Sequence, residues 1–252
     1  MQPELHIGPI TLQTFGLMMG LAFVVSGALV ARRLRELGRP VDWAYEMVFA
    51  ALVGGIVGAR LWWVAENWSD AKDDLVGSLF SGSGLVWYGG AIGGAICVLA
   101  WAWRRGFFGL TLLDVASVPL AAGYAVGRIG CQLAGDGDYG IPWNGPWAMA
   151  YPHGTVPTTE KVHPTPVYET ITMLIVAALL WRLRDRWRPG TLFALYLILA
   201  GAERFLVEFV RRNGAVLLGL TQPQLLSLAM IAGGAIWLWV RRPVAAPAPA
   251  RA

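Results

Sequence analysis

Long runs of apolar residues, separated by short polar connections, occupy most of this chain. The runs are continuous and do not alternate apolar with polar positions, so they predict α-helices instead of the strands of a barrel. A helix needs about 20 residues to cross the hydrocarbon core of a bilayer, and each run comes close to that length. We therefore predict seven transmembrane helices, at Ile10–Ala31, Trp43–Ala65, Leu85–Trp103, Leu110–Val126, Pro166–Trp181, Thr191–Val210 and Thr221–Val240.

Basic residues are unequally divided between the two sets of connections. Most of the 20 Lys and Arg residues follow the first, third, fifth and seventh runs, as in the stretches 32–39 and 182–188. The other set of connections holds Lys72, Arg128, Lys161, Arg211 and Arg212. Short loops rich in Lys and Arg stay in the cytoplasm. This bias predicts an N-terminus outside the membrane and a C-terminus in the cytoplasm.

The composition supports this fold class. The chain has 252 residues, of which 56% are hydrophobic and 14% charged, whereas about 25% of a soluble domain is charged. The 13 Trp and 31 Gly residues suit membrane interfaces and close helix packing. The net charge of +4 arises from arginines in short loops, so it does not predict a nucleic-acid partner. We predict an all-α, polytopic integral membrane protein.

The domain organisation follows from the connections. Residues 1–242 are predicted to form a single membrane domain, with two long outer connections at residues 66–84 and 128–164. The second contains Pro142, Trp143 and Trp147, which is too apolar for a disordered linker and predicts a small head on the outer leaflet. Residues 243–252 are rich in Ala and Pro and are predicted to be disordered.

Among the charged residues inside the predicted spans, three carry the argument about chemistry. Arg60 lies in the second span, and Arg204 and Glu208 lie in the sixth. An arginine facing lipid at a helix centre costs about 2.5–3.5 kcal/mol, so these side chains are expected to face the bundle interior. Arg204 and Glu208 are four residues apart and share a helix face. The pair fits a structural ion pair as well as a functional site.

The stretch from Gly127 to Gly140 has the most informative chemistry. Arg128 follows an apolar run, and glycines and two carboxylates, Asp136 and Asp138, come after it. A guanidinium at a membrane boundary, next to glycine-rich backbone, favours a site for an anionic head group.

Other motifs have simpler interpretations. Gly89-Gly90 and Gly93-Gly94 have the four-residue spacing of close helix contacts, and Tyr88 precedes them. His163 has no second histidine at ligand spacing, so no zinc site is predicted. We predict no metal and no cofactor.

Together these pieces resemble the prolipoprotein diacylglyceryl transferase family over most of the chain. The matching motifs occur in family order: Gly58-Ala59-Arg60-Leu61, Tyr88-Gly89-Gly90-Ala91-Ile92-Gly93-Gly94, Asp114 with Pro119, Gly127-Arg128-Ile129-Gly130, His163-Pro164-Thr165 with Tyr168-Glu169, Arg204-Phe205-Leu206-Val207-Glu208-Phe209, and Gln224-Leu225-Leu226-Ser227. The ordered set is specific, although no single piece is.

The resemblance implies a reaction and its partners. Family members move the diacylglyceryl group of phosphatidylglycerol to the lipobox cysteine of a secreted prolipoprotein, so the implied partners are phosphatidylglycerol and prolipoprotein signal peptides. A thioether forms and glycerol 1-phosphate leaves. The resemblance places such a protein in the lipid bilayer of the bacterial inner membrane, with its active site toward the periplasm.

The resemblance also implies residue roles. Arg128 and Arg204 would hold the phosphate, Glu208 would orient Arg204, and Tyr88 would take or relay the thiol proton. Asp136 aligns with the family's acidic residue after the glycine-arginine motif. The implied substrate-binding residues are Arg60, Gly89, Gly90, Gly127, Gly130, Cys131, Gly140, His163 and Tyr168.

The chain departs from the family pattern at several positions. Cys131 and Ala134 stand where the family has Asn, and Phe15 and Ala200 stand where it has Tyr. One interpretation is a divergent transferase in which Gln132, Asp138 or Tyr139 compensates. The alternative is a paralogue that acts on or binds another phospholipid head group, with Cys131 as a possible nucleophile. A transporter fits less well, because no inverted repeat is visible.

Overall fold

Seven helices of 17 residues or more dominate the part of the chain that the structure describes. The structure is a computed structural model that describes residues 1–72, 74–80 and 86–241. The long helices are α1 (Thr14–Glu36), α2 (Trp43–Glu66), α5 (Trp87–Arg104), α6 (Leu110–Ala134), α7 (Thr165–Leu183), α8 (Thr191–Val207) and α9 (Gln222–Arg241). Two short helices, α3 (Trp68–Ala71) and α4 (Leu75–Phe80), follow α2. The predicted tail, residues 243–252, lies outside the described residues.

Short antiparallel hairpins accompany the helices. They pair β1 (Glu4–Ile7) with β2 (Ile10–Gln13), β3 (Met149–Tyr151) with β4 (Thr158–Val162), and β5 (Ala215–Leu217) with β6 (Leu220–Thr221). The first hairpin corrects the predicted start of the first span, because Ile10–Gln13 is a strand and the helix begins at Thr14. Gly8, with φ +62°, makes the turn that pairs Leu5 with Leu12.

Five of the described helices are long and apolar enough to cross a membrane: α1, α2, α6, α7 and α9. Helix α6 also continues past Val126, the predicted end of its span, to Ala134. It ends where Gly135 adopts a left-handed φ of +60° and donates its amide to the Cys131 carbonyl at 2.9 Å. Arg128 therefore lies on a helix and not at the start of a loop.

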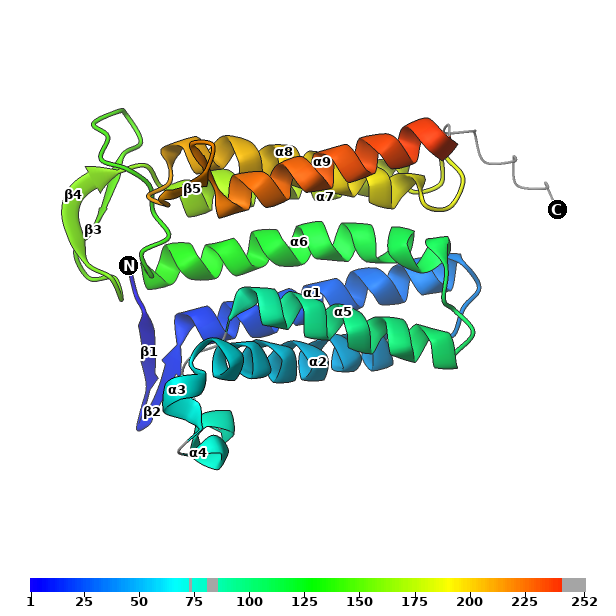
Figure 1. Cartoon of the computed structure of the whole chain (residues 1–252), viewed down its shortest axis with the longest axis horizontal. Coiled ribbons are helices and arrows are strands. Elements are labelled where there is room, and N and C mark those ends of the chain that lie inside the picture. The colour runs from blue at the N-terminus through cyan, green and yellow to red at the C-terminus, as the bar shows by residue number, and fades with distance from the viewer. Residues whose placement is uncertain (73, 81–85, 242–252) are drawn as a thin grey trace. The chain divides into compact units, whose positions relative to one another are not determined.

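The residues pack as two compact units. The first comprises Met1–Leu29 and the chain from Leu113 onward, and the second comprises Val30–Leu112. In the first unit, α6, α7 and α8 share a buried core that includes Ala121, Met173, Leu180 and Leu192. Helices α7, α8 and α9 run alongside one another (Figure 1). Gly201 and Gly234 bring α8 and α9 so close that a Cβ at either position would meet backbone oxygen of the other helix, at 2.9 and 2.6 Å.

The second unit contains the α2–α5 pair. Gly54 and Gly58 on α2 face Gly89 and Gly93 on α5, and a Cβ on any of the four would collide with backbone atoms of the opposite helix. The glycine spacing in α5 therefore serves close helix contact, as the sequence predicted. Glu46 on α2 links to α5 by accepting hydrogen bonds from Trp101 Nε1 and Arg105 Nε, at 2.7 and 2.8 Å.

The segment between α6 and α7 has a small buried core of its own. The rings of Tyr139 and Tyr151 stack with centroids 4.8 Å apart, and both side chains are buried with Val162. Burial raises the pKa of Tyr151 to about 12. The segment predicted as an apolar head is thus folded around an aromatic core.

Candidate active site

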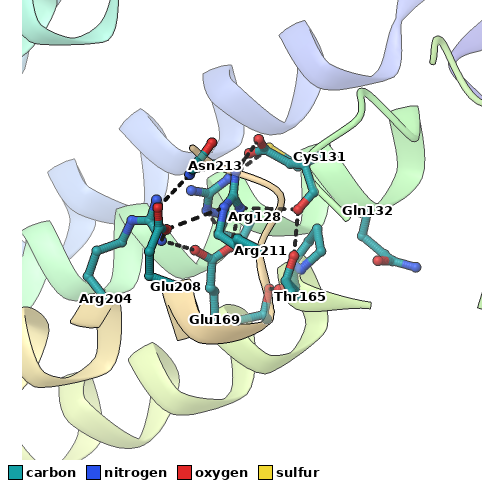
Figure 2. Close-up of polar contacts among 12 residues, drawn as sticks. Arg128, Cys131, Gln132, Thr165, Glu169, Arg204, Glu208, Arg211 and Asn213 are labelled. Carbon is teal, nitrogen blue, oxygen red and sulfur yellow. Dashed lines mark hydrogen bonds and ion pairs between the residues drawn. The ribbon is translucent and has the colours of Figure 1, made fainter. Parts of the chain in front are cut away.

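Arg128 lies on the last two turns of α6 and anchors a cluster of buried charges (Figure 2). Its Nε is 2.9 Å from Glu169 Oε2, and its Nη1 forms an ion pair with Asp138 Oδ2. The guanidinium also lies over the ring of Tyr124, with its carbon 5.1 Å from the ring centre. An arginine so largely buried is stable only when it is paired, and the two carboxylates supply that pairing.

Glu169 is the central carboxylate of the cluster. It lies in the second turn of α7, after the sequence His163-Pro164-Thr165-Pro166, and its side chain has 0% exposure. Its Oε2 is 3.6 Å from Arg211 Nη1, and its Oε1 is 3.9 Å from Arg204 Nη1. The Tyr124 hydroxyl donates to Oε1 at 3.0 Å. One buried anion therefore faces three arginines from three parts of the chain.

The predicted Arg204–Glu208 pair is present, with Nη1 and Oε2 2.6 Å apart. Arg204 is in the last turn of α8, and Glu208 begins a 3-10 turn, Glu208–Val210, that follows it. Glu208 is also fully buried, and it accepts hydrogen bonds at 2.7 Å from both Asn213 Nδ2 and Thr221 Oγ1. These contacts hold Glu208 in place beside Arg204.

Arg211 is a third cation that the sequence reasoning placed only among the loop charges. Its Nη2 lies 2.6 Å from Asp138 Oδ1, and its Nη1 donates to the Asp138 carbonyl at 3.1 Å. Burial alone would lower the pKa of Arg211, but Asp138 and Glu169 outweigh it and raise the pKa. The sequence contains one indication of this role. Arg211 comes three residues after Glu208, and at that spacing in a helical turn its side chain can reach the Glu208 carboxylate.

Asp138 bridges Arg128 and Arg211. Burial would raise the pKa of its carboxyl, but the two guanidinium groups outweigh it and hold the pKa below its ordinary value. Asp136, two residues earlier, differs: burial raises its pKa, and its Oδ1 accepts the Asp138 amide at 3.3 Å. Of the two, Asp138 is the one whose carboxylate forms ion pairs with Arg128 and Arg211.

Cys131 lies one turn after Arg128 on α6, with its Sγ 3.6 Å from Arg128 Nη1. The thiol is buried, with 7% exposure. Cys131, Asp136 and Asp138 bring one potential metal ligand each within 4.8 Å of one another. Both Asp138 oxygens, however, already pair with arginines, and a cation there would lie next to Arg128. This donor set fits a metal poorly, and its arginines favour an anion.

Of the three groups proposed to compensate for the missing amides, Asp138 contacts Arg128. Gln132 points away from the arginines (Figure 2), and its Oε1 accepts the Tyr151 hydroxyl at 2.9 Å. The Tyr139 hydroxyl donates to the Val156 carbonyl at 3.0 Å. Phe15 packs on Gly130, where a Cβ would be 3.4 Å from its ring.

His163 and Tyr168 pair with each other beside the head. His163 Nδ1 is 3.1 Å from the Tyr168 hydroxyl, which also accepts a hydrogen bond from Trp147 Nε1 at 2.8 Å. The His163 ring stacks on Trp143 with centroids 4.3 Å apart, and burial lowers its pKa. Both side chains thus belong to an aromatic group at the start of α7.

The predicted glycines differ in how closely the chain packs on them. Gly140 is tightly enclosed: a Cβ there would collide with the Val210 carbonyl and lie 2.9 Å from the His163 side chain. Gly127, in contrast, has nothing within 4 Å of the position of a Cβ. Gly140 therefore lets the chain after Asp138 pass beside the 3-10 turn.

Four of the predicted residues belong to the second unit. Arg60 is buried on α2 with its guanidinium carbon 4.5 Å from the centre of the Trp63 ring. Tyr88 is the second residue of α5 and meets Trp87 edge to face, with ring centroids 5.3 Å apart. Gly89 packs on α2 as described, and Gly90 lies nearest to Gly55 and Ala59.

Comparison with known proteins assigns the chain to a family. The family model described as prolipoprotein diacylglyceryl transferase matches residues 3–240. The chain belongs to the prolipoprotein diacylglyceryl transferase family. It is 34% identical over 201 residues to the phosphatidylglycerol–prolipoprotein diacylglyceryl transferase of Clostridium tetani, covering 78% of this chain and 80% of that protein. It is 35% identical over 239 residues to the protein of the same name from Dehalococcoides mccartyi strain 195, covering 90% and 88%.

Membership of this transferase family agrees with the charge cluster and the apolar helices. The chain is a multi-pass membrane protein, and the family match includes the whole of the first unit's arginine cluster. Similarity to the bacterial relatives extends over both units, so the motifs in α2 and α5 belong to the same family match.

Proposed function

We propose that this protein transfers the diacylglyceryl group of phosphatidylglycerol to the lipobox cysteine of prolipoproteins. The observation that carries this proposal is the group of three arginines, Arg128, Arg204 and Arg211, buried against Glu169. The cations would stabilise the phosphate as negative charge develops on the leaving group. Relatives named for this reaction support the proposal.

The chemistry requires one bond to form and one to break. The thiolate sulfur attacks the glyceryl carbon that bears the phosphate ester, and the carbon–oxygen bond to the phosphate breaks. The electron pair leaves on the oxygen of glycerol 1-phosphate, where the arginines would bind it. The thiol proton must go to a base, since thiolate is the nucleophile. We assign that proton to Tyr88, directly or through a relay, as the resemblance implies.

The remaining predicted roles extend the same proposal. Glu208 would orient Arg204, as its contacts with Arg204, Asn213 and Thr221 support. Asp136 would line the head-group site. The substrate-binding set would comprise Arg60, Gly89, Gly90, Gly127, Gly130, Cys131, Gly140, His163 and Tyr168.

The membrane arrangement is part of the proposal. All seven long helices, α5 and α8 included, would cross the bilayer as one membrane domain. The N-terminus would lie outside and the C-terminus in the cytoplasm of a bacterial inner membrane. The arginine cluster would then face the periplasmic side, where the signal peptide of a secreted prolipoprotein arrives in the bilayer. The unequal distribution of arginine between the connections supports this orientation.

The test is complementation in a bacterium depleted of its own transferase. The chain is expected to restore thioether formation on a reporter prolipoprotein, measured by mass spectrometry of its lipid-modified peptide. Arg128→Ala is expected to lower the transfer rate at least 100-fold, because one lost oxyanion-type contact costs on the order of 10²–10³. Arg186→Ala, at an exposed position, serves as the matched control. Correct insertion without any lipidation of the reporter would refute the proposal.

The alternative, a paralogue with Cys131 as its own nucleophile, receives less support. The thiol is buried and lies beside carboxylates as well as Arg128. Cys131→Ser is expected to leave transfer within a factor of three. Loss of activity together with a covalent lipid adduct on Cys131 would favour the alternative.

A further inference from the structure

The three carboxylates that pair with the arginines differ in how accessible they are. Glu169 and Glu208 have 0% side-chain exposure, whereas Asp138 has 33%. Glu169 is inside α7, and Glu208 has two further hydrogen bonds at 2.7 Å. Asp138, in contrast, lies on the loop between α6 and β3. Glu169 and Glu208 are therefore fixed partners of the arginines, and Asp138 is the partner that is exposed to solvent.

The Asp138 carboxylate has the geometry of a bound anion. Its two oxygens divide between two cations, with Oδ2 on Arg128 and Oδ1 2.6 Å from Arg211 Nη2. A phosphodiester also has two non-bridging oxygens and one negative charge, and arginine forks bind both kinds of group through pairs of N–H donors. The same two guanidinium groups would thus satisfy either anion.

The backbone of Asp138 is held independently of its carboxylate. Thr165 Oγ1 donates to the Asp138 carbonyl at 2.5 Å, and Arg211 Nη1 donates to it at 3.1 Å. Gly137, with φ +93°, and the enclosed Gly140 fix the chain on either side. The side chain can therefore change rotamer without unfolding the loop, and Arg211 retains one contact while it does so.

The balance of charge favours a phosphodiester that replaces the Asp138 carboxylate over one that binds beside it. Arg128, Arg204 and Arg211 carry three positive charges, and Asp138, Glu169 and Glu208 carry three negative charges. A phosphodiester that entered beside Asp138 would add a negative charge to a largely buried site that already holds these carboxylates, which is costly. A phosphodiester that replaces the carboxylate leaves the balance unchanged.

We propose that Asp138 occupies the phosphate position of the lipid site and that its carboxylate swings away from Arg128 and Arg211 when the lipid head group binds. This inference rests on the proposed function for the identity of the anion. It assigns the phosphate to the Arg128–Arg211 pair, whereas the sequence assigned it to Arg128 and Arg204. Asp138 also supplies the counter-ion that both arginines need when the phosphate product leaves.

The test measures binding, with no transfer step. The full-length protein is purified in a neutral detergent, and its affinity for dihexanoyl phosphatidylglycerol is compared with its affinity for dihexanoylglycerol, which lacks the phosphate. Asp138→Asn is expected to bind the phosphatidylglycerol at least threefold more tightly than the unaltered protein, with no change for dihexanoylglycerol. Glu160→Gln removes one charge at an exposed position of the same connection and is expected to change neither affinity. Equal or weaker phosphatidylglycerol binding by Asp138→Asn would overturn the proposal.

A second variant covers the case in which Asp138→Asn folds poorly. Asp138→Ala leaves space between the two arginines, so acetate is expected to raise the melting temperature of this variant and to compete with dihexanoyl phosphatidylglycerol. Acetate is expected to leave the unaltered protein unchanged. An acetate effect that is the same for both proteins would contradict a vacated anion position. If the predicted binding changes occur but no prolipoprotein is modified, the proposed reaction fails and this inference stands.

Discussion

At the scale of single residues, the site depends on pairing that no side chain achieves alone. Arg128, Arg204 and Arg211 are largely buried, and isolated charges in such a place would be prohibitively costly. Glu169 links all three. The sequence indicated Arg204 and Glu208 because they are charged residues within an apolar run, and Arg128 because it follows such a run and precedes a glycine-rich stretch. From the sequence, Glu169 appeared only as part of the Tyr168-Glu169 motif, and Arg211 appeared only among the basic residues of the connections.

The role of Glu169 gives a prediction about stability. Glu169→Gln keeps the volume of the side chain and removes its charge, which leaves Arg128 and Arg211 with less compensation. Breaking a buried ion pair from one side costs about 3–5 kcal/mol, so the melting temperature in detergent is expected to fall clearly. Glu160→Gln, an exposed change of the same kind, is the control and is expected to have no effect. A Glu169→Gln variant as stable as the control would contradict a central structural role for this carboxylate.

At the scale of elements, close helix contacts and helix ends position the side chains. The glycine spacing in α5 predicted a close helix contact, and the structure identifies α2 as the partner through Gly54 and Gly58. The end of α6 was predicted too early, because the hydropathy falls at Arg128 although the helix continues to Ala134. Hydropathy shows where the run of apolar residues ends, and the helix can continue beyond that point.

The α2–α5 contact can be tested with two glycines of one helix. A Cβ at Gly58 would lie 2.8 Å from Gly93 Cα and collide with the Gly89 carbonyl, whereas a Cβ at Gly55 would lie 3.7 Å from the nearest atom. Gly58→Ala is therefore expected to lower stability by about 1–3 kcal/mol through overpacking. Gly55→Ala is expected to be neutral or slightly stabilising, because alanine favours helix. Equal thermal stability of the two variants in detergent would argue against the close contact.

At the scale of the whole molecule, the chain is a multi-pass membrane protein of a lipid-using transferase family. Its helices are apolar on most faces, as expected where the solvent is lipid. Exposed large residues such as Val24, Tyr45, Phe49 and Trp103 would be unfavourable on a soluble protein but suit a bilayer. The buried arginines of the charge cluster are stable among these apolar helices because carboxylates pair with them.

The orientation gives a prediction for the entire chain. With the N-terminus outside, alkaline phosphatase fused after Lys161 is expected to be exported and active, and the same enzyme fused after Arg188 is expected to be inactive. The physical reason is that arginine-rich connections remain in the cytoplasm. Activity of the Arg188 fusion, with the Lys161 fusion silent, would reverse the proposed topology.

The sequence by itself determined the membrane class, the approximate positions of the long helices, the family, and three members of the charge cluster. These features depend on composition, on periodicity and on ordered local motifs. Only the tertiary structure decided that Asp138, Glu169 and Arg211 meet Arg128, since these residues come from segments up to about 80 positions apart. Ion pairing is a short-range contact, so it depends on where helix ends and a loop converge, and no local pattern in the chain encodes that convergence.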